Sequence, residues 1–285
     1  MSAAAPVPSL NLARSRKGPK RRSWLAVPAM AAVTLLAGCG GGSGPDAGSP
    51  AAGASSSAAG AVSGTVTVFA AASLTESFGT LGKQFEAAHP GVMVRFDFAA
   101  SSALAESISQ SAPADVFASA STKDMDSVVK SGDAGAPKTF AKNVMEIAVP
   151  ADNPAGVTDV ADLAKPGLKL AVCQQQVPCG ATAQQVFDKA KIAVKPVTLG
   201  ADVKAVLTAV RLGEVDAGVV YKTDVDAAGT KVKGIEIPAE ENASTSYPIA
   251  TLGKAPNAAA ARAFVDYVLS TDGTKVLTEA GFASP

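Results

Sequence analysis

The chain of 285 residues has one histidine, one tryptophan and three cysteines, and aromatic residues make up only 5% of it. The single histidine, His89, leaves few options for hydrolytic mechanisms, which mostly use imidazole as the acid or base. The chain also has no excess of either charge, because it carries 25 basic and 25 acidic side chains. Binding to nucleic acid depends on a basic surface, and this balance argues against it.

The charges that are present lie unevenly along the chain. Residues 1–38 contain six basic side chains and no acidic one, so the remaining 247 residues carry a formal charge of −6. A hydrophobic content of 47% is typical of a globular protein and too high for a disordered one. A length of about 250 residues can bury a sizeable core, either as one large domain or as two lobes.

The first 38 residues have the order of a secretory signal peptide. Two consecutive arginines precede an apolar run over 24–36, which is too short to span a bilayer comfortably. The run ends in Leu-Ala-Gly before Cys39, and this junction resembles the lipobox of bacterial lipoproteins, in which the cysteine is lipidated and becomes the first residue. A buried cysteine in a signal-like helix is the alternative, and the arginine pair leaves the twin-arginine export route open.

The segment after Cys39 consists almost wholly of Gly, Ser, Ala and Pro. Such a composition cannot bury a core and behaves as a flexible chain. We therefore expect a signal peptide over 1–38, lipidation of Cys39 and a lipid-anchored tether over 39–63.

The other two cysteines, Cys173 and Cys179, lie six positions apart in a chain that its signal directs out of the cytoplasm. Exported proteins keep disulfides, so we expect these two to be bonded to each other. Two free thiols are the alternative, whereas a metal site would need further Cys or His ligands that the sequence does not offer. Closing so small a ring adds about 2 kcal/mol of stability, so the bond is expected mainly to fix the shape of a local loop.

Beyond residue 64 the chain alternates short β-branched runs with alanine-rich stretches of helical periodicity. This alternation predicts an α/β protein with mostly parallel strands. The expected strands are Thr65–Ala70, Val92–Ala99, Val116–Ala118, Glu146–Val149, Leu168–Val172 and Ala217–Tyr221. The expected helices are Leu74–Ala88, Ala103–Gln110, Lys123–Ser131, Thr182–Ala190, Val203–Leu212 and Ala258–Ser270.

Ligands of open α/β sheets bind beyond the carboxyl ends of the strands, so the strand-to-helix junctions are the informative places. Ser73 follows the first strand, and Glu76 stands three residues later, which is the spacing of a capping box. Ser101 and Ser102 follow the second strand. Two further helices are expected to start after the Pro-Cys-Gly sequence that contains Cys179 and after Asp202, at Val203.

A serine at a helix start usually does no more than cap the helix. Several uncharged helix starts in one acidic chain nevertheless favour a site where backbone N–H groups and hydroxyls hold an oxyanion. A site made only of donors suits a fully deprotonated anion, because a protonated one would leave a contact unpaired.

The sequence resembles the molybdate-binding proteins of ABC transporters, a branch of the periplasmic binding proteins, over nearly all of 65–283. The segments that carry the resemblance are Val66–Thr75, Phe98–Ala105, Ala112–Ala120, Val177–Gly180 and Gly218–Tyr221. It implies an α/β, two-lobed periplasmic binding protein fold of type II, with a hinge and a ligand cleft between the lobes. The resemblance also implies that lobe 1 comprises 64–143 and 247–285, and that lobe 2 comprises 144–246.

In that family, hydroxyls and amides from both lobes hold the anion, and the positions that match them are expected to do so here. Those positions are Ser73, Ser101, Cys179, Val203 and Tyr221, with Ser102 as the alternative to its neighbour Ser101. Cys179 and Val203 would act through their backbone N–H groups, and Tyr221 through its phenol. Familiar members have no cysteines in the loop between Cys173 and Cys179, which makes that loop a departure from the family pattern.

The resemblance implies an extracytoplasmic solute-binding lipoprotein, not an enzyme, that captures molybdate and delivers it to an ABC permease, with tungstate as a near-isosteric competitor. We expect a monomer without a cofactor, with no metal other than the molybdenum of its ligand, no nucleic-acid partner, and membrane contact only through the lipid anchor.

Other functions stay open at this point. The nearest alternative is a binding protein for another oxyanion such as sulfate, or for a small organic acid, since one fold serves many ligands. A serine hydrolase is disfavoured because the sequence contains no GxSxG and its one histidine lies in an expected turn. A structural lipoprotein would not need repeated serine-bearing helix starts.

Overall fold

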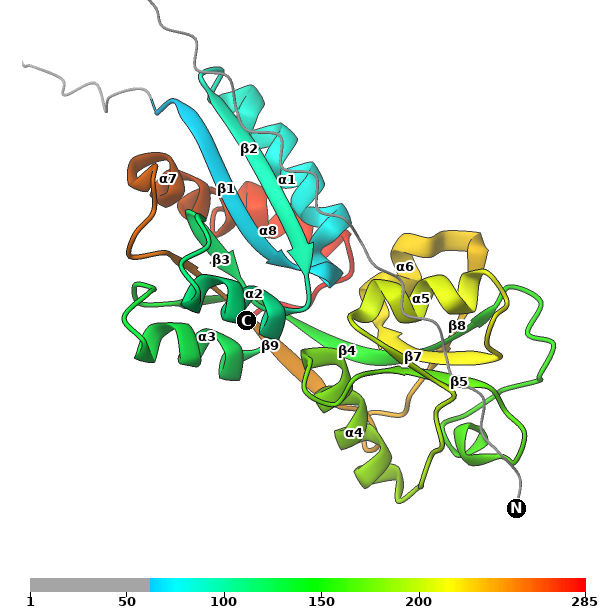
Figure 1. The fold of residues 1–285 in the computed structure, drawn as a ribbon. Helices are drawn as coiled ribbons and strands as arrows, with labels where there is room; N and C mark the ends of the chain where they lie inside the picture. The colour runs from blue at the N-terminus through cyan, green and yellow to red at the C-terminus, as the bar shows by residue number, and fades with distance from the viewer. Residues whose placement is uncertain (1–61) are drawn as a thin grey trace, which may run out of the picture. The chain divides into compact units, whose positions relative to one another are not determined.

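Two long strands, β4 (Lys138–Pro150) and β9 (Ser244–Thr251), pair antiparallel in the middle of the sheet and link its two halves (Figure 1). The computed structural model describes residues 62–285. The expected signal peptide, the lipidation at Cys39 and all but the end of the tether lie outside the described residues. Within them, the strand order is β2-β1-β3-β9-β4-β7-β5-β6, and β8 pairs with β4.

The remaining elements follow in chain order. The strands are β1 (Gly64–Ala71), β2 (Val92–Ala99), β3 (Val116–Ala118), β5 (Leu170–Cys173), β6 (Thr198–Gly200), β7 (Ala217–Tyr221) and β8 (Val232–Glu236). The helices are α1 (Thr75–Ala88), α2 (Ser101–Ser109), α3 (Thr122–Lys130), α4 (Pro178–Ala190), α5 (Val203–Arg211), α6 (Lys222–Ala228), α7 (Ala258–Val268) and α8 (Thr271–Glu279). Short 3₁₀ helices are η1 (Ala72–Leu74), η2 (Ala161–Ala164) and η3 (Gly229–Lys231).

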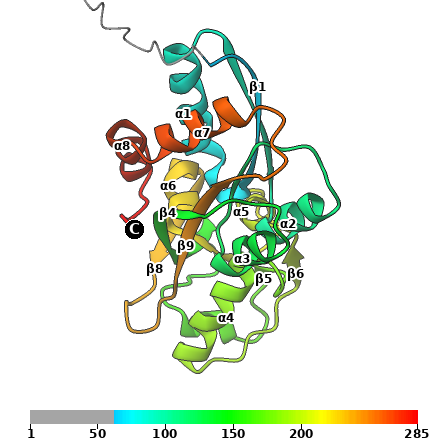
Figure 2. The ribbon, with the colours of Figure 1, turned by 90° about the vertical axis from the view of Figure 1, so that its left-hand side faces the viewer.

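In one half of the sheet, β1 lies between β2 and β3 and runs parallel to both. Its alternate residues Val66 and Val68 are fully buried and pack with α1, α7 and α8, whereas Phe69 packs on the other face with α2 and α3. Figure 2 shows these two groups of helices on opposite sides of β1. A strand covered on both faces is apolar almost throughout, which accounts for the Val- and Ala-rich sequence of β1.

The other half holds β5, β6 and β7 in parallel and is packed by α4, α5 and α6. The apolar face of α5 includes Val206 and Val210, both fully buried. These side chains lie directly over Gly218 of β7, where a Cβ would be 2.7 Å from Val210 Cγ2 and 2.8 Å from Val206 Cγ1. The glycine therefore allows the helix to sit close to the strand, which fixes the position of the helix start at Val203.

The buried core separates into clusters that follow the chain. One cluster takes nearly all its members from 145–243, and only Ala72 and Ala100 join it from elsewhere. Two further clusters draw on 66–141 and 247–282. In the part of the chain that the structure describes, no helix is both long and apolar enough to cross a lipid bilayer.

The α/β prediction is confirmed, and all six expected strands and six expected helices form. The strands β2, β3 and β7 have the predicted bounds, and the other elements differ at one or both ends. The expectation of mostly parallel strands is wrong, because four of the eight strand pairings within residues 62–285 are antiparallel. The sequence pattern missed the short strands β6 and β8 and the helices α6 and α8. It also missed the longer β9, whose Pro248 cannot donate a ladder hydrogen bond. The strand tolerates this proline because β4 is irregular between Thr139 and Ala141, directly opposite.

Candidate functional site

A narrow cavity of about 20 Å³ lies where strands end and helices begin, between η1, α2, α4, α5 and the end of β7. All five residues that the resemblance places at the anion line this cavity, namely Ser73, Ser101, Cys179, Val203 and Tyr221. They come from five separate segments of the chain, spread over almost 150 residues. A cavity of this size accommodates a guest of the size of a water molecule or a small ion.

Tyr221 is the last residue of β7, and its side chain is almost fully buried, with 1% exposed. Its phenolic oxygen has no hydrogen-bond partner among the described residues. Burial raises the pKa of Tyr221 well above the usual 10.0, so the phenol keeps its proton and can donate it. Buried polar groups are nearly always paired, so an unpaired phenol that lines a cavity points to a ligand as its partner.

The hydroxyls of the two serines each take part in a hydrogen bond within the protein. Ser101 Oγ accepts a hydrogen bond from the backbone N–H of Ala120 at 2.9 Å. Ser73 Oγ lies 2.9 Å from the phenolic oxygen of Tyr247. Both serines are buried and line the cavity. The proton of the Ser101 hydroxyl is therefore available for an acceptor in the cavity.

Three of the helix starts at the cavity have no side-chain cap. No side chain of the N-cap residue accepts a hydrogen bond from the first turn of η1, α2 or α4. Elsewhere in the described chain, α3, α7 and α8 are each capped in this way, by Ser121, Asn257 and Ser270. The first N–H groups of a helix have no intrahelical partner, so the uncapped starts direct orphan donors and a positive dipole end at the cavity.

The fourth helix start, that of α5, is capped. Asp202 accepts a hydrogen bond from the N–H of Ala205 at 2.9 Å, which leaves the earlier N–H of Val203 for another partner. Asp202 is the only charged residue among the described residues that line the cavity. Within the same residues, no group of three His, Cys, Asp or Glu side chains is placed to hold a metal ion. The site can thus bind an anion only through neutral donors.

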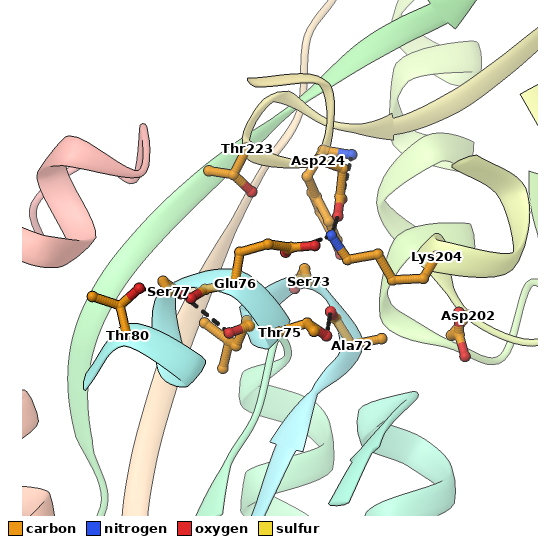
Figure 3. Close-up of polar contacts among 12 residues, drawn as sticks. Ala72, Ser73, Thr75, Glu76, Ser77, Thr80, Asp202, Lys204, Thr223 and Asp224 are labelled. Carbon is orange, nitrogen blue, oxygen red and sulfur yellow. Dashed lines mark hydrogen bonds and ion pairs between the residues drawn. The ribbon is translucent and has the colours of Figure 1, made fainter. Parts of the chain in front are cut away.

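An ion-pair network lies beside the cavity and joins α1, α5 and α6 (Figure 3). Lys204 Nζ lies 2.7 Å from Glu76 Oε2 and 2.9 Å from Asp224 Oδ1. Burial lowers the pKa of Lys204, but the charges of Asp224 and Glu76 outweigh it, and the net shift is upward. Burial raises the pKa of Asp224, and Lys204 offsets part of that shift. The lysine charge is used within the network, so it does not serve as the counter-charge of the cavity.

The predicted capping box of Ser73 and Glu76 is wrong. Ser73 lies within η1, and α1 begins only at Thr75, after Leu74 as its N-cap. The Ser73 hydroxyl contacts Tyr247. The Glu76 carboxylate points instead to Lys204, as Figure 3 shows. The tertiary partners of both side chains compete with the local cap and replace it.

The disulfide between Cys173 and Cys179 is confirmed, with a Cα–Cα distance of 5.7 Å. It closes the loop between β5 and α4, so that Cys179 lies in the first turn of α4. The next residue, Gly180, lies so close to the loop that a Cβ would be 2.0 Å from the carbonyl oxygen of Gln174. Together the disulfide and this contact hold the start of α4 against the end of β5.

The remaining residues considered from sequence lie away from the cavity. Ser102 faces a separate hollow beside α3, so Ser101 is the serine of the pair that the structure brings to the other four. Asp115 is buried and accepts hydrogen bonds from the N–H groups of Thr67 and Asn257, which ties β1 to the start of α7. His89 ends α1 and stacks on Phe85.

Sequence reasoning missed the residue behind Ser73. Tyr247 is fully buried and belongs to β9, the strand that was not predicted. It lies 174 positions from its partner Ser73, so no local pattern could have connected the two. The sequence placed Asp202 before a helix but did not assign it as the N-cap of α5, although Asp is a preferred N-cap residue.

An α/β sheet whose strand ends surround a small cavity lined with hydrogen-bond donors defines a protein that binds a small solute. The chain belongs to the bacterial extracellular solute-binding protein family, whose family model matches residues 66–283. It is therefore a binding protein that acts outside the cytoplasm, and not an enzyme. The predicted fold class, an α/β periplasmic binding protein fold, is confirmed.

The molybdate-binding proteins ModA of Mycobacterium bovis and Mycobacterium tuberculosis are 44% identical to the chain over 222 residues, or 78% of this chain and 85% of theirs. The periplasmic molybdate-binding protein of Azotobacter vinelandii superposes with a TM-score of 0.70 at 20% identity, over 77% of this chain and 99% of that one. The sulfate-binding protein SubI of Mycobacterium tuberculosis gives a TM-score of 0.67 at 19% identity, over 77% and 86%. At these identities the two structures show the shared fold alone.

Proposed function

We propose that this protein captures molybdate outside the cytoplasm and delivers it to the permease of an ABC transporter, with tungstate as a near-isosteric competitor. The observation that carries the proposal is the convergence of Ser73, Ser101, Cys179, Val203 and Tyr221 on one cavity. The phenol of Tyr221 adds a further donor, which has no acceptor among the described residues. The 44% identity to ModA proteins supports molybdate as that acceptor.

The donor set favours a doubly negative tetrahedral anion. Molybdate offers four acceptor oxygens and no proton, so every hydroxyl and N–H group around it can donate. A hydrogen-bearing oxyanion would bring its own donor against these donors and leave a buried contact unsatisfied. The narrow cavity, about 20 Å³, also argues against an organic acid of several carbon atoms.

Sulfate is the second candidate, because it is also a tetrahedral dianion and because SubI shares the fold. The two anions differ mainly in size, and a pocket that fits the larger one makes longer, weaker contacts with the smaller. Proteins of this kind would thus separate them by pocket radius rather than by charge.

The binding residues are proposed to belong to two lobes, over 64–143 with 247–285 and over 144–246. The separate core clusters on either side of these boundaries support the division. Ser73 and Ser101 would come from lobe 1, and Cys179, Val203 and Tyr221 from lobe 2. A guest held by both lobes would favour the closed form, since it contacts both only when they approach. The strands β4 and β9 connect the lobes and would carry the hinge.

The protein is further proposed to act as a monomeric lipoprotein, anchored through Cys39 by the tether over 39–63. The signal-like order of 1–38 and the Leu-Ala-Gly-Cys junction support this anchor. A Cys39→Ala variant should appear in the soluble fraction, whereas the wild type should remain with the membrane. Equal fractionation of the two would overturn the proposed lipid anchor and would leave the proposed molybdate binding unaffected.

Isothermal titration calorimetry with molybdate, tungstate, sulfate and phosphate tests the proposed function. Molybdate and tungstate should bind with similar Kd values, each roughly 100-fold below that of sulfate. Ser101→Ala should weaken molybdate binding, and Ser102→Ala is the matched control that should leave it unchanged. Equal affinities for sulfate and molybdate would overturn the assignment and favour a sulfate carrier.

A further inference from the structure

We propose that Tyr247 is a positioning residue, which orients the hydroxyl of Ser73 as a donor to the anion and thereby helps the site to reject protonated oxyanions. The inference rests on the proposed function and deepens it. It concerns a buried chain of hydrogen bonds behind the cavity, formed by Asn143, Tyr247 and Ser73.

The chain begins at Asn143 in β4, which is buried with 2% of its surface exposed. Its side-chain oxygen Oδ1 lies 3.0 Å from the backbone N–H of Val144. A backbone N–H can only donate, so the oxygen must face it, and the amide cannot be turned around. The Asn143 NH₂ group therefore faces the other way, toward Thr223 Oγ1 at 2.8 Å and Tyr247 Oη at 3.5 Å.

Tyr247 Oη thus accepts a hydrogen bond from Asn143 and has its own proton to donate. Ser73 Oγ, 2.9 Å away, is the only acceptor that the described contacts offer to it. A buried phenol proton without an acceptor is costly, so Tyr247 donates to Ser73 and not the reverse. Burial also raises the pKa of Tyr247, which keeps the phenol protonated.

Ser73 then has one of its two lone pairs engaged by Tyr247 and its own proton free. Ser73 lines the cavity, so that proton can be donated to a guest there. Ser73 also lines a larger open hollow between α1, α6 and α8. The bond from Tyr247 fixes the orientation of the hydroxyl and favours donation of its proton to the cavity. A protonated oxyanion that places its O–H at this position faces the Ser73 proton and finds no acceptor for its own.

The same logic does not apply to the other hydroxyls that surround Ser73. Ser77 Oγ donates to the carbonyl of Leu74 and Thr75 Oγ1 to that of Ala72, so both are satisfied within the turn. Ser101 is oriented by a backbone N–H, from Ala120, which no side-chain substitution removes. Tyr247 is therefore the position at which the direction of a binding hydroxyl depends on a replaceable side chain.

Tyr247→Phe tests the inference, because it removes one oxygen and keeps the ring in contact with Phe282 and Phe140. Molybdate affinity should fall about tenfold, the effect of one lost or misdirected hydrogen bond. Tyr267→Phe is the matched control, because it removes a phenol that donates to Gln84 on the surface. Neither of these two residues lines the cavity. The control should leave the Kd unchanged, and thermal melting should show both variants folded.

A double-mutant cycle separates positioning from general stabilisation. If Tyr247 acts through Ser73, then Ser73→Ala with Tyr247→Phe should bind molybdate no more weakly than Ser73→Ala alone. Additive losses would show that Tyr247 acts independently of Ser73 and would overturn the inference. So would an unchanged Kd in Tyr247→Phe.

Competition with sulfate and hydrogen phosphate supplies a readout that a structural role would not move. These two anions are similar in size and differ by one proton. Tyr247→Phe should reduce the preference for sulfate over phosphate several-fold, since the freed Ser73 hydroxyl can turn to accept. If the wild type binds molybdate but the sulfate-to-phosphate preference is the same in Tyr247→Phe, the inference is wrong and the proposed function is unaffected. A wild type that fails to bind molybdate would overturn the proposed function and this inference with it.

Discussion

Lys204 connects two helix starts on either side of the cavity through its ion pair with Glu76, whose Oε2 lies 2.7 Å from Nζ. Glu76 stands three residues after Ser73, and Lys204 directly follows Val203. The two carboxylates that share this lysine differ sharply, because the side chain of Glu76 is 53% exposed and that of Asp224 is 0% exposed. Removing one partner should therefore have very different consequences from removing the other.

Lys204→Met should destabilise the protein by about 3 kcal/mol, because it leaves the carboxylate of Asp224 buried without its cation. Glu76→Gln should change the free energy of unfolding by less than about 1 kcal/mol, since exposed pairs contribute little. Urea denaturation of both variants measures the difference. Lys222→Met, which removes an exposed pair with Asp226, is the control and should resemble Glu76→Gln. Equal losses for Lys204→Met and Glu76→Gln would contradict this account.

Acid stability should depend on Asp162, which is buried in η2 and accepts two hydrogen bonds from Thr158. The hydrogen bond from Lys165, followed by that from the Thr158 backbone, lowers the pKa of Asp162 from 3.8 to about 2. Between these values the unfolded chain binds more protons than the folded one. The stabilisation is therefore complete above pH 3.8 and is lost as the pH falls toward 2.

Asp162→Asn should flatten that part of the pH profile of the free energy of unfolding. Urea titrations between pH 2 and pH 5 measure it. Asp159→Asn, a neighbour in the same turn, provides a control for the loss of one negative charge. A wild-type slope that persists in Asp162→Asn would assign the acid transition to other carboxylates.

Tyr221→Phe should separate binding from stability. The phenolic oxygen has no partner among the described residues, so its removal should leave the melting temperature of the ligand-free protein unchanged or raise it. Molybdate affinity should nevertheless fall about tenfold, since the anion loses a donor. Calorimetric titration and thermal melting of the same preparation give both quantities. A lower melting temperature with unchanged affinity would show that the phenol serves the fold instead.

Replacing Cys173 and Cys179 together by alanine should lower stability more than affinity. The disulfide closes a small loop, for which about 2 kcal/mol is expected, while the proposed contact of Cys179 with the anion would use the backbone N–H. Thermal melting and titration with molybdate measure the two effects, and the wild type with a reductant is the matched comparison. An unchanged melting point with a large loss of affinity would show that the disulfide shapes the site.

Local patterns were sufficient to predict most of the described helices and strands, but not α6, α8, β6, β8 and β9. The β-branched run of β1 and the three- and four-residue spacing of Val203, Val206 and Val210 in α5 each encode a periodicity. β9 gave no such signal, because its alternation is broken by Pro248 and its place in the sheet depends on a partner about 100 residues away. The proportion of antiparallel pairs follows from β4 and β9 and was underestimated for the same reason.

The five residues that line one cavity were predicted from family motifs. A motif match identifies a position in the chain but not the orientation of its side chain. The sequence could not show which way a side chain turns. Glu76 has capping-box spacing, yet it pairs with Lys204, 128 positions away. Likewise, the partner of Ser73 could not be inferred, because Tyr247 reaches it only after the whole sheet has assembled.

The uncapped starts of η1, α2 and α4 have a consequence for the unloaded protein. Ser121, Asn257 and Ser270 cap other helices with their side chains. The first N–H groups of η1, α2 and α4 have no such cap and are open to a ligand. A bound oxyanion would become a shared component of several secondary-structure elements at once, and its departure would loosen them together. Backbone amides at these three starts should accordingly exchange their hydrogens faster in the empty protein than in the loaded one.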